Sequence, residues 1–200
     1  MSVAEEVDRS VALIQWLDEK LNGLSISSSE RARLSAAAFD VAHEHHKAIV
    51  LLIHNKLPGS AFALARPLLE SYLRGEWILQ CATDSDIGSI LKDKRRPTFE
   101  RLINDIEALE GFRIGVLSSL KGALWNSLNS YTHSGFLQLV RRMTSETIEA
   151  NYDEAELVEV LRFSASYAIV SAIGSAHVAQ NVSLAEALLQ KAKEYQGRAA

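Results

Sequence analysis

Arg66 and Glu70 are the residues whose types and spacing most directly suggest chemistry. They stand four positions apart in a segment that is otherwise almost entirely apolar. On a helix, residues at this spacing lie one turn apart on the same face, where a guanidinium and a carboxylate form an ion pair. We expect this segment to be central and the pair to be buried, which costs free energy unless further hydrogen bonds complete it. The pair predicts an internal contact that fixes helix packing, a functional site or a plain surface pair.

A second polar group ends at His133. Solvent faces of helices normally carry Lys and Glu, but one side of this segment carries only uncharged residues: Gly122, Asn126, Asn129, Ser130 and His133. The face predicts a buried hydrogen-bonded seam, the wall of a cleft or polar side chains that are simply exposed. Buried charges need hydrogen-bond partners, and this face can supply them. We therefore expect these residues to converge in space: Arg66, Glu70, His133, Asn126, Asn129 and His45.

Histidines at positions 43, 45 and 46 raise the question of a metal site. The zinc-protease pattern His-Glu-x-x-His fails because Lys47 stands four positions after His43. Di-metal bundles use Glu-x-x-His, and Glu70 has no histidine at that spacing. The helical spacing predicts His45 on an apolar stripe and His43 on a polar one. We expect no metal and no cofactor, with metal binding through His43 and His46, one turn apart, as the alternative.

The charge balance limits the classes of partner. With 21 Lys and Arg against 25 Asp and Glu, the formal net charge is −4, which excludes a protein that coats DNA through a generally basic surface. One local run is basic: Lys92, Lys94, Arg95, Arg96 and Arg101. It predicts either a solvated loop or an RNA contact. Glycine-rich phosphate loops, the Gly-x-Ser-x-Gly elbow and paired cysteines do not occur, which disfavours the enzyme classes that they mark.

Compartment is indicated by three features of the chain. The single cysteine, Cys81, fits a reducing environment. Charged residues such as Glu5 and Glu6 stand where a secretory signal would be apolar. Residues 163–179 carry no Asp, Glu, Lys or Arg, but this stretch contains Ser and His and is shorter than the roughly 20 apolar residues that span a bilayer. We expect a cytoplasmic protein with no membrane association.

Helical periodicity runs through the whole chain. Apolar residues recur at three and four positions rather than at two, and only 3 Pro and 10 Gly interrupt them. The signals for helix starts are Ser2, Ser27 with Glu30, Asp153 and Ser183. The predicted helices are residues 3–22, 27–55, 60–82, 84–92, 98–109, 115–131, 136–143, 153–181 and 183–194. The sequence thus predicts an all-α protein, one domain over residues 1–200, folded as a single bundle of seven to nine helices.

The long helix at 153–181 also predicts a homodimer. Small side chains gather on one broad face of it, which lets another helix approach closely: Ser164, Ala168, Ser171, Ala172 and Ser175. That other helix belongs either to a second copy or to the same chain.

Two short motifs carry a resemblance to known proteins. Ala-Arg-Pro-Leu-Leu-Glu at 65–70 is followed by Asn-Ser-Leu-Asn-Ser-Tyr-Thr-His at 126–133. This pairing resembles uncharacterised bacterial all-helical proteins with an Arg-x-x-x-Glu helix and a later Ser-x-x-His element. More distantly, it is similar to the HEPN helical bundles of toxin and phage-defence systems. The resemblance covers residues 61–139.

The resemblance implies a helical bundle and assigns site residues. HEPN ribonucleases have an Arg four to six positions before a His, and both act on the scissile phosphodiester. Here those positions carry no Arg. The resemblance matches His133 to the catalytic His and Glu70 to an acidic residue on a neighbouring helix, and Arg66 would replace the missing Arg from a different helix.

Two functions from different classes follow. In the first, the protein acts through protein or ligand binding, as a component of a defence or toxin–antitoxin system. In the alternative, it is a metal-independent ribonuclease in which Arg66 stabilises phosphate charge, His133 transfers protons and Glu70 orients one of them, while Asn126 and Asn129 position the substrate. An open site where the three residues converge favours chemistry, whereas a closed, dry core favours binding.

Overall fold

The protein folds into an all-helical bundle, as the sequence predicts. The computed structural model describes residues 1–94, 97–112 and 114–197. These residues form nine α-helices and contain no strand, only an isolated bridge between Met143 and Ile148. The helices are α1 (Val3–Leu21), α2 (Glu30–His54), α3 (Pro58–Gln80), α4 (Asp84–Leu91), α5 (Phe99–Glu107), α6 (Val116–Thr132), α7 (Phe136–Val140), α8 (Glu154–Val178) and α9 (Val182–Gly197); a 3-10 turn, η1 (Glu110–Phe112), precedes α6.

Helices with a predicted cap begin at polar cap residues, as expected, but two of the caps are not the predicted residues. Ser2 caps α1 in a capping box with Glu5, as expected. The prediction of Ser27 as the next cap was wrong, because Ser29 caps α2 and its side chain accepts a hydrogen bond from the backbone N–H of Ala32. The prediction that Ser183 caps the last helix was also wrong, because Asn181 Oδ1 accepts a hydrogen bond from the backbone N–H of Leu184 at the start of α9. The cap of α2 thus lies two positions after the predicted residue, and the cap of α9 lies two positions before it.

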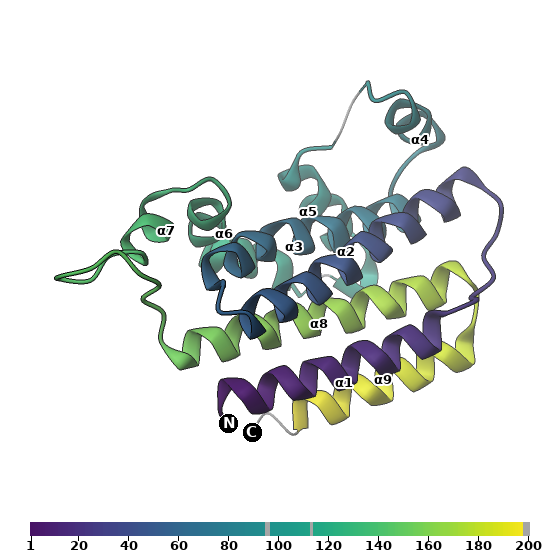
Figure 1. Ribbon diagram of the computed structural model, residues 1–200. Coiled ribbons are helices and arrows are strands. Elements are labelled where there is room, and N and C mark those ends of the chain that lie inside the picture. The colour runs from purple at the N-terminus through teal and green to yellow at the C-terminus, as the bar shows by residue number, and fades with distance from the viewer. Residues whose placement is uncertain (95–96, 113, 198–200) are drawn as a thin grey trace.

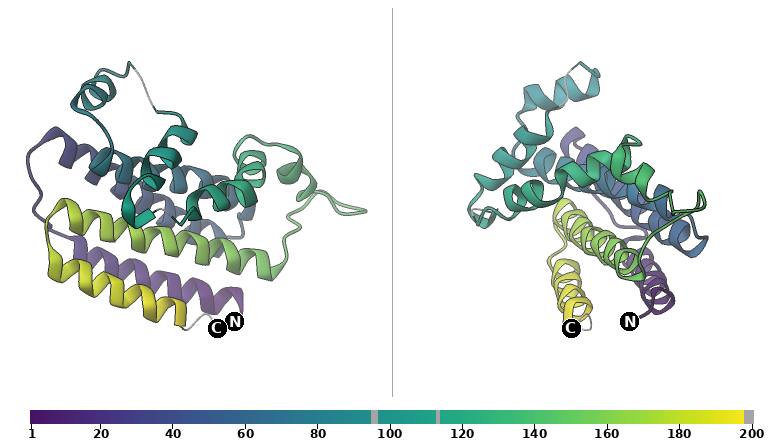
Figure 2. Two further views of the ribbon diagram at one scale, coloured as in Figure 1. Left: turned by 180° about the vertical axis from the view of Figure 1, so that it is seen from behind. Right: turned by 90° about the vertical axis from the view of Figure 1, so that its left-hand side faces the viewer.

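The long helices form two layers that share α8 (Figure 1). On one side of α8, α2 and α3 pack against each other as a helical hairpin, and both contact α8. On its other side lie α1 and α9, as the end-on view in Figure 2 also shows. The shorter helices α5 and α6 cover the far side of α3. Helix α7 and the bend after it project from one end of the bundle (Figures 1 and 2).

Phe39 occupies the crossing of α2, α3 and α8. Its side chain is fully buried. Gly75 of α3 and Gly174 of α8 face its ring so closely that a Cβ at either position would fall within 3.0 Å of ring atoms. The two glycines therefore let three backbones approach one aromatic ring.

A buried ionic cluster ties α1 to α8 and α9. Glu6 is fully buried; its Oε2 accepts from Arg162 Nε at 3.0 Å and its Oε1 accepts from the Tyr195 hydroxyl at 2.9 Å. Arg9 approaches Glu6 at 3.5 Å, and its guanidinium carbon lies 3.7 Å from the centre of the Tyr195 ring. Partners from three helices thus satisfy the carboxylate.

The small-residue face of α8 is used inside the chain. Ser164, Ala168, Ser171 and Ala172 are fully buried, and α8 packs against α1, α2 and α9. The reason given for a homodimer therefore no longer applies, because α8 finds its close partners in the same chain. Among the described helices, α8 alone is long and apolar enough to cross a membrane, but most of its apolar window is buried inside the bundle.

Candidate functional site

Arg66 and Glu70 form the predicted ion pair on α3. Arg66 Nε donates to Glu70 Oε1 at 2.8 Å. The two side chains are 20% and 23% exposed, so they lie at the edge of the core, and the deeper burial expected from the sequence was wrong. The reason is that α6 covers this face of α3 without sealing it. Solvent reaches the pair, which therefore remains accessible to a ligand.

His133 completes the arrangement from a different element. Its Nε2 lies 2.6 Å from Arg66 Nη1. A guanidinium has only donors to offer, so His133 Nε2 is the acceptor and carries no proton in this contact. His133 is the C-cap residue of α6, where the chain turns through Ser134 at φ 52°. One residue earlier, the hydroxyl of Thr132 lies 2.8 Å from the carbonyl oxygen of Leu128 and 3.2 Å from that of Ala63, so its one hydrogen is shared between α6 and α3 at this end of α6.

Trp125 and Phe99 support the guanidinium and were not predicted as site residues. The guanidinium carbon of Arg66 lies 4.7 Å from the centre of the Trp125 ring, a cation–π contact. The other neighbour of that ring is Phe99 of α5, stacked with centroids 4.0 Å apart. The sequence holds a signal for Trp125, because it stands eight positions, or about two helical turns, before His133.

Arg74 is a further residue that the sequence analysis missed. Its Nη2 lies 3.9 Å from Glu70 Oε2, and its side chain is 35% exposed. Arg66, Glu70 and Arg74 follow each other at intervals of four, the spacing that aligns side chains along one helix face. With two guanidinium groups and one carboxylate, this row carries a net positive charge.

The predicted substrate-binding residues differ in their surroundings. Asn126 is exposed, and Asn129 is half-buried with an Oδ1 that has no hydrogen-bond partner among the described residues. His45 was expected on an apolar stripe beside the site. It is half-buried on α2 and its ring forms no hydrogen bond or ion pair with any described residue. The structure thus joins Arg66, Glu70 and His133 by direct contacts and gives no such contact to His45.

The buried histidines are instead His43 and His46, one turn apart on α2. His46 Nδ1 donates to the Ser164 hydroxyl at 2.9 Å, since that hydroxyl gives its own hydrogen to the carbonyl of Leu161. Burial lowers the pKa of His43 to about 4 and that of His46 to about 3. The predicted polar stripe for His43 was wrong. Within the described ranges, no three His, Cys, Asp or Glu side chains are placed to hold a metal ion.

The basic run divides into two parts. Lys92 and Lys94 are exposed, whereas Arg95 and Arg96 lie outside the described residues. Arg101 is not available for phosphate, because its Nη1 and Nη2 donate to Asp86 at 3.1 and 3.2 Å. These hydrogen bonds are the first cause that lowers the pKa of Asp86 to about 2.

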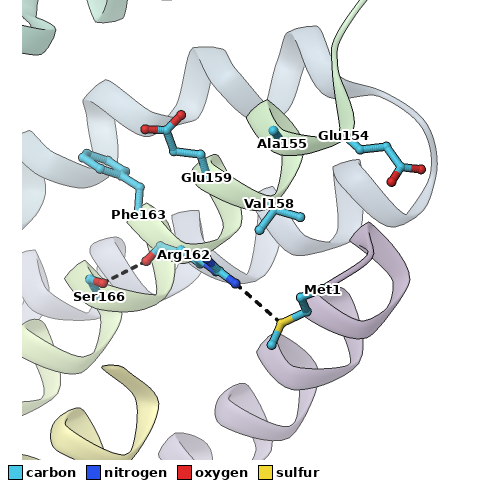
Figure 3. A pocket seen from close by; sticks show the side chains of 8 residues that line it. All are labelled: Met1, Glu154, Ala155, Val158, Glu159, Arg162, Phe163 and Ser166. Carbon is cyan, nitrogen blue, oxygen red and sulfur yellow. Dashed lines mark hydrogen bonds between the residues drawn. The ribbon is translucent and has the colours of Figure 1, made fainter. Parts of the chain in front are cut away.

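Another surface hollow is separate from the Arg66 site. It encloses about 730 Å³ between α8 and the N-terminus, and Figure 3 shows Arg162 reaching across it toward Met1. Arg162 Nη2 lies 3.7 Å from the Met1 sulfur, and its Nε is held by Glu6. None of its lining residues belongs to the Arg66 row or to α6.

Comparison with known proteins places the chain in a family. A match covers residues 39–199, and its description is a family of unknown function (DUF6988). The chain belongs to DUF6988. No curated protein and no solved structure matches the chain. The part of the chain that matches DUF6988 contains every residue of the Arg66 row together with Trp125 and His133, whereas α1 precedes it.

The site of this DUF6988 protein combines a fixed guanidinium, which can bind an anion, with an imidazole, which can transfer protons. Arg66 keeps N–H groups beyond those directed at Glu70 and His133, because a guanidinium has five. His133 is exposed, and an imidazole is the side chain best suited to exchange protons near neutral pH. Glu70 and Trp125 fix the guanidinium from its edge and from its face. Such a group can bind a phosphodiester and transfer protons to or from it.

Proposed function

We propose that Arg66 and His133 form a phosphodiester-binding site and that the protein cleaves RNA without a bound metal. The observation that carries the proposal is the 2.6 Å contact between Arg66 Nη1 and His133 Nε2 at a solvent-accessible position. A closed, dry core would have favoured a purely structural pair. The similarity to HEPN ribonucleases supports the same assignment, with Arg66 taking the place of the arginine that is missing before His133.

The proposed reaction uses the 2′-hydroxyl of the RNA as the nucleophile. His133 Nε2 takes the proton of that hydroxyl once Arg66 turns its N–H groups to the phosphate. The 2′-oxygen then forms a bond to phosphorus, and the bond from phosphorus to the 5′-oxygen breaks. The leaving 5′-oxygen receives a proton from the histidinium. The products are a 2′,3′-cyclic phosphate and a 5′-hydroxyl, and Arg66 stabilises the charge that develops on the phosphoryl oxygens.

The test is cleavage of single-stranded RNA by the purified protein. We expect wild type to produce 2′,3′-cyclic phosphate ends in the presence of a chelator, and His133→Ala to lose at least about 100-fold in rate, the range for a general acid–base group. Arg66→Lys should lose at least about tenfold, because an ammonium lacks the planar fork of N–H groups with which a guanidinium contacts a carboxylate and a phosphate. His54→Ala, at an exposed histidine of α2, is the matched control. Equal activity of His133→Ala and wild type would disprove the proposal.

A second function, binding of a second copy of the chain, is favoured by the projecting end of the bundle. Large apolar side chains are exposed directly after His133: Phe136, Leu139, Met143 and Ile148. Exposed apolar side chains gathered in this way are typical of protein interfaces. We expect a homodimer in sedimentation at micromolar concentration, and Phe136→Glu should convert it to the 22.0 kDa monomer. A wild-type monomer would contradict the dimer without touching the ribonuclease proposal.

A further inference from the structure

A hollow of about 430 Å³ adjoins the Arg66 row on α3. Its volume lies in the range of small-molecule sites. It shares two residues with the row and is lined by Glu70, Arg74, Trp77, Ile78, Ile90, Asp93 and Pro97. These residues come from α3, the last turn of α4 and the segment that leads to α5. The hollow therefore opens beside the proposed cleavage site.

We propose that this hollow binds a guanine base of the RNA that is cleaved at Arg66 and His133. The inference rests on the proposed function and adds a sequence preference to it. The walls are apolar at Ile78, Ile90 and Pro97, which suits the faces of a heterocyclic base. One guanidinium, that of Arg74, stands at the edge of the hollow. Arginine contacting O6 and N7 is the commonest specific contact with guanine in nucleic-acid complexes.

Arg74 has donors to spare for a base. Its distance of 3.9 Å from Glu70 Oε2 is too long for a hydrogen bond, and Arg74 forms none with any described residue. Trp77, in contrast, is fixed. It is fully buried, its indole N–H donates to Asp105 Oδ2 at 2.7 Å, and the guanidinium of Arg101 lies over its ring. The hollow thus has a rigid floor, and the guanidinium of Arg74 at its edge donates no hydrogen bond to a described residue.

The spacing along α3 fits a nucleic-acid strand. Arg66 and Arg74 are eight residues apart, which is about 12 Å along a helix axis. Stacked nucleotides rise about 3.4 Å each, so a strand covers this distance in roughly three to four nucleotides. Lys92 and Lys94 are exposed on either side of the lining residue Asp93, so two further cationic side chains lie next to the hollow.

The experiment maps cleavage in oligouridine RNAs that contain one guanosine at varied positions. We expect wild type to cut at a constant offset of about three to four nucleotides from the guanosine. Arg74→Ala removes the base contact, and Ile90→Trp fills the hollow without touching the ion pairs. In both variants the cut should no longer fall at a constant distance from the guanosine, and the KM for the guanosine substrate should rise at least tenfold. Arg33→Ala, at an exposed arginine of α2, should keep the offset. Thermal melts show whether each variant is folded.

The experiment distinguishes failure of the guanine-site proposal from failure of the RNA-cleavage proposal. Cleavage by wild type without an offset, an offset from another base, or an offset unchanged in both variants would overturn the guanine site and leave the cleavage proposal standing. If wild type does not cleave, binding of fluorescent oligonucleotides decides. A tenfold preference for guanosine over oligouridine that Arg74→Ala and Ile90→Trp abolish supports the hollow, and equal binding of both RNAs overturns it.

Discussion

Arg66 is held by three different kinds of contact. Glu70 accepts its Nε–H, His133 accepts from its Nη1, and Trp125 lies against its face. The position of Arg66 and Glu70 could be predicted from their interval in an apolar helix, and His133 from the uncharged face that ends there. The aromatic support could not be assigned, because tryptophan and phenylalanine at helical spacing look the same whether they fill a core or carry a cation. The direction of the Arg74 side chain likewise depends on neighbours that only the fold supplies.

Removal of Glu70 should cost stability to an intermediate degree. Its pair with Arg66 is about one-fifth exposed, so Glu70→Ala should lower the free energy of unfolding by about 1–2 kcal/mol, between the values for exposed and for fully buried pairs. Urea titration measures this loss. Glu100→Ala is the control, because its pair with Lys121 is on the surface, and it should cost under about 1 kcal/mol. A loss at Glu70 no larger than at Glu100 would contradict this view of the pair.

Buried His46 makes the protein less stable in acid. Its pKa is lowered to about 3 in the folded protein, whereas an unfolded chain protonates histidine near 6.5. Between these values the unfolded state binds more protons, so stability is complete above pH 6.5 and falls as the pH is lowered, by up to about 1.4 kcal/mol per pH unit for each such histidine. Burial raises the pKa of Glu76, which acts in the opposite direction.

The histidine contribution is isolated by substitution. His46→Asn should flatten the dependence of the unfolding free energy on pH between 6.5 and 4, measured by denaturant titration at several pH values. His54→Asn, at an exposed histidine, should leave the slope unchanged. Parallel curves for wild type and His46→Asn would contradict the assignment.

At the scale of the elements, the number and type of helices could be predicted because the 3.6-residue period is unbroken. The buried face of α2 could not be. That helix packs against both α3 and α8, so it is buried on two sides, and Ser35, His43 and His46 lie inward beside Phe39. A helical wheel that assumes one apolar face then selects the wrong stripe, which is how His45 was misplaced. The cap positions shifted because several nearby polar side chains can each accept the first N–H groups.

Adding a single methyl group at the crossing of α2, α3 and α8 should destabilise the protein. Gly174→Ala brings a Cβ into the ring of Phe39 and should lower the free energy of unfolding by about 1–3 kcal/mol through overpacking. Adding Phe39→Leu should recover part of the loss, and a double-mutant cycle measures this coupling. Gly88→Ala in α4 meets nothing within 4 Å and should be neutral or slightly stabilising. Additive losses in the cycle would argue against the contact.

For the whole molecule, the ionic cluster around Glu6 joins the beginning and the end of the chain. The DUF6988 match starts at residue 39, yet α1 contributes the carboxylate that Arg162 and Tyr195 share. The sequence offered no sign of this cluster, because its members are about 150 to 190 positions apart and Glu6 looks like an ordinary charged residue of a first helical turn.

Glu6→Ala should therefore destabilise the entire bundle. It leaves Arg9 and Arg162 without their shared carboxylate, and breaking a buried pair in this way costs about 3–5 kcal/mol. Thermal unfolding should remain a single transition at a lower temperature, because α1, α8 and α9 lose a common partner. Glu19→Ala, exposed on the same helix, should change stability by under about 0.5 kcal/mol. Two separate transitions would instead show that α1 detaches alone.

The rate at which the Phe39 ring flips also reports on the motion of the bundle. A phenylalanine ring normally rotates by 180° many times a second in a protein interior, but here the two glycine backbones leave no room for the ring to sweep. Rotation requires α3 and α8 to move apart together, and α8 is packed against most of the other long helices. The flip rate of this one ring, read from the line shapes of its aromatic proton resonances, therefore reports how often the protein expands as a whole.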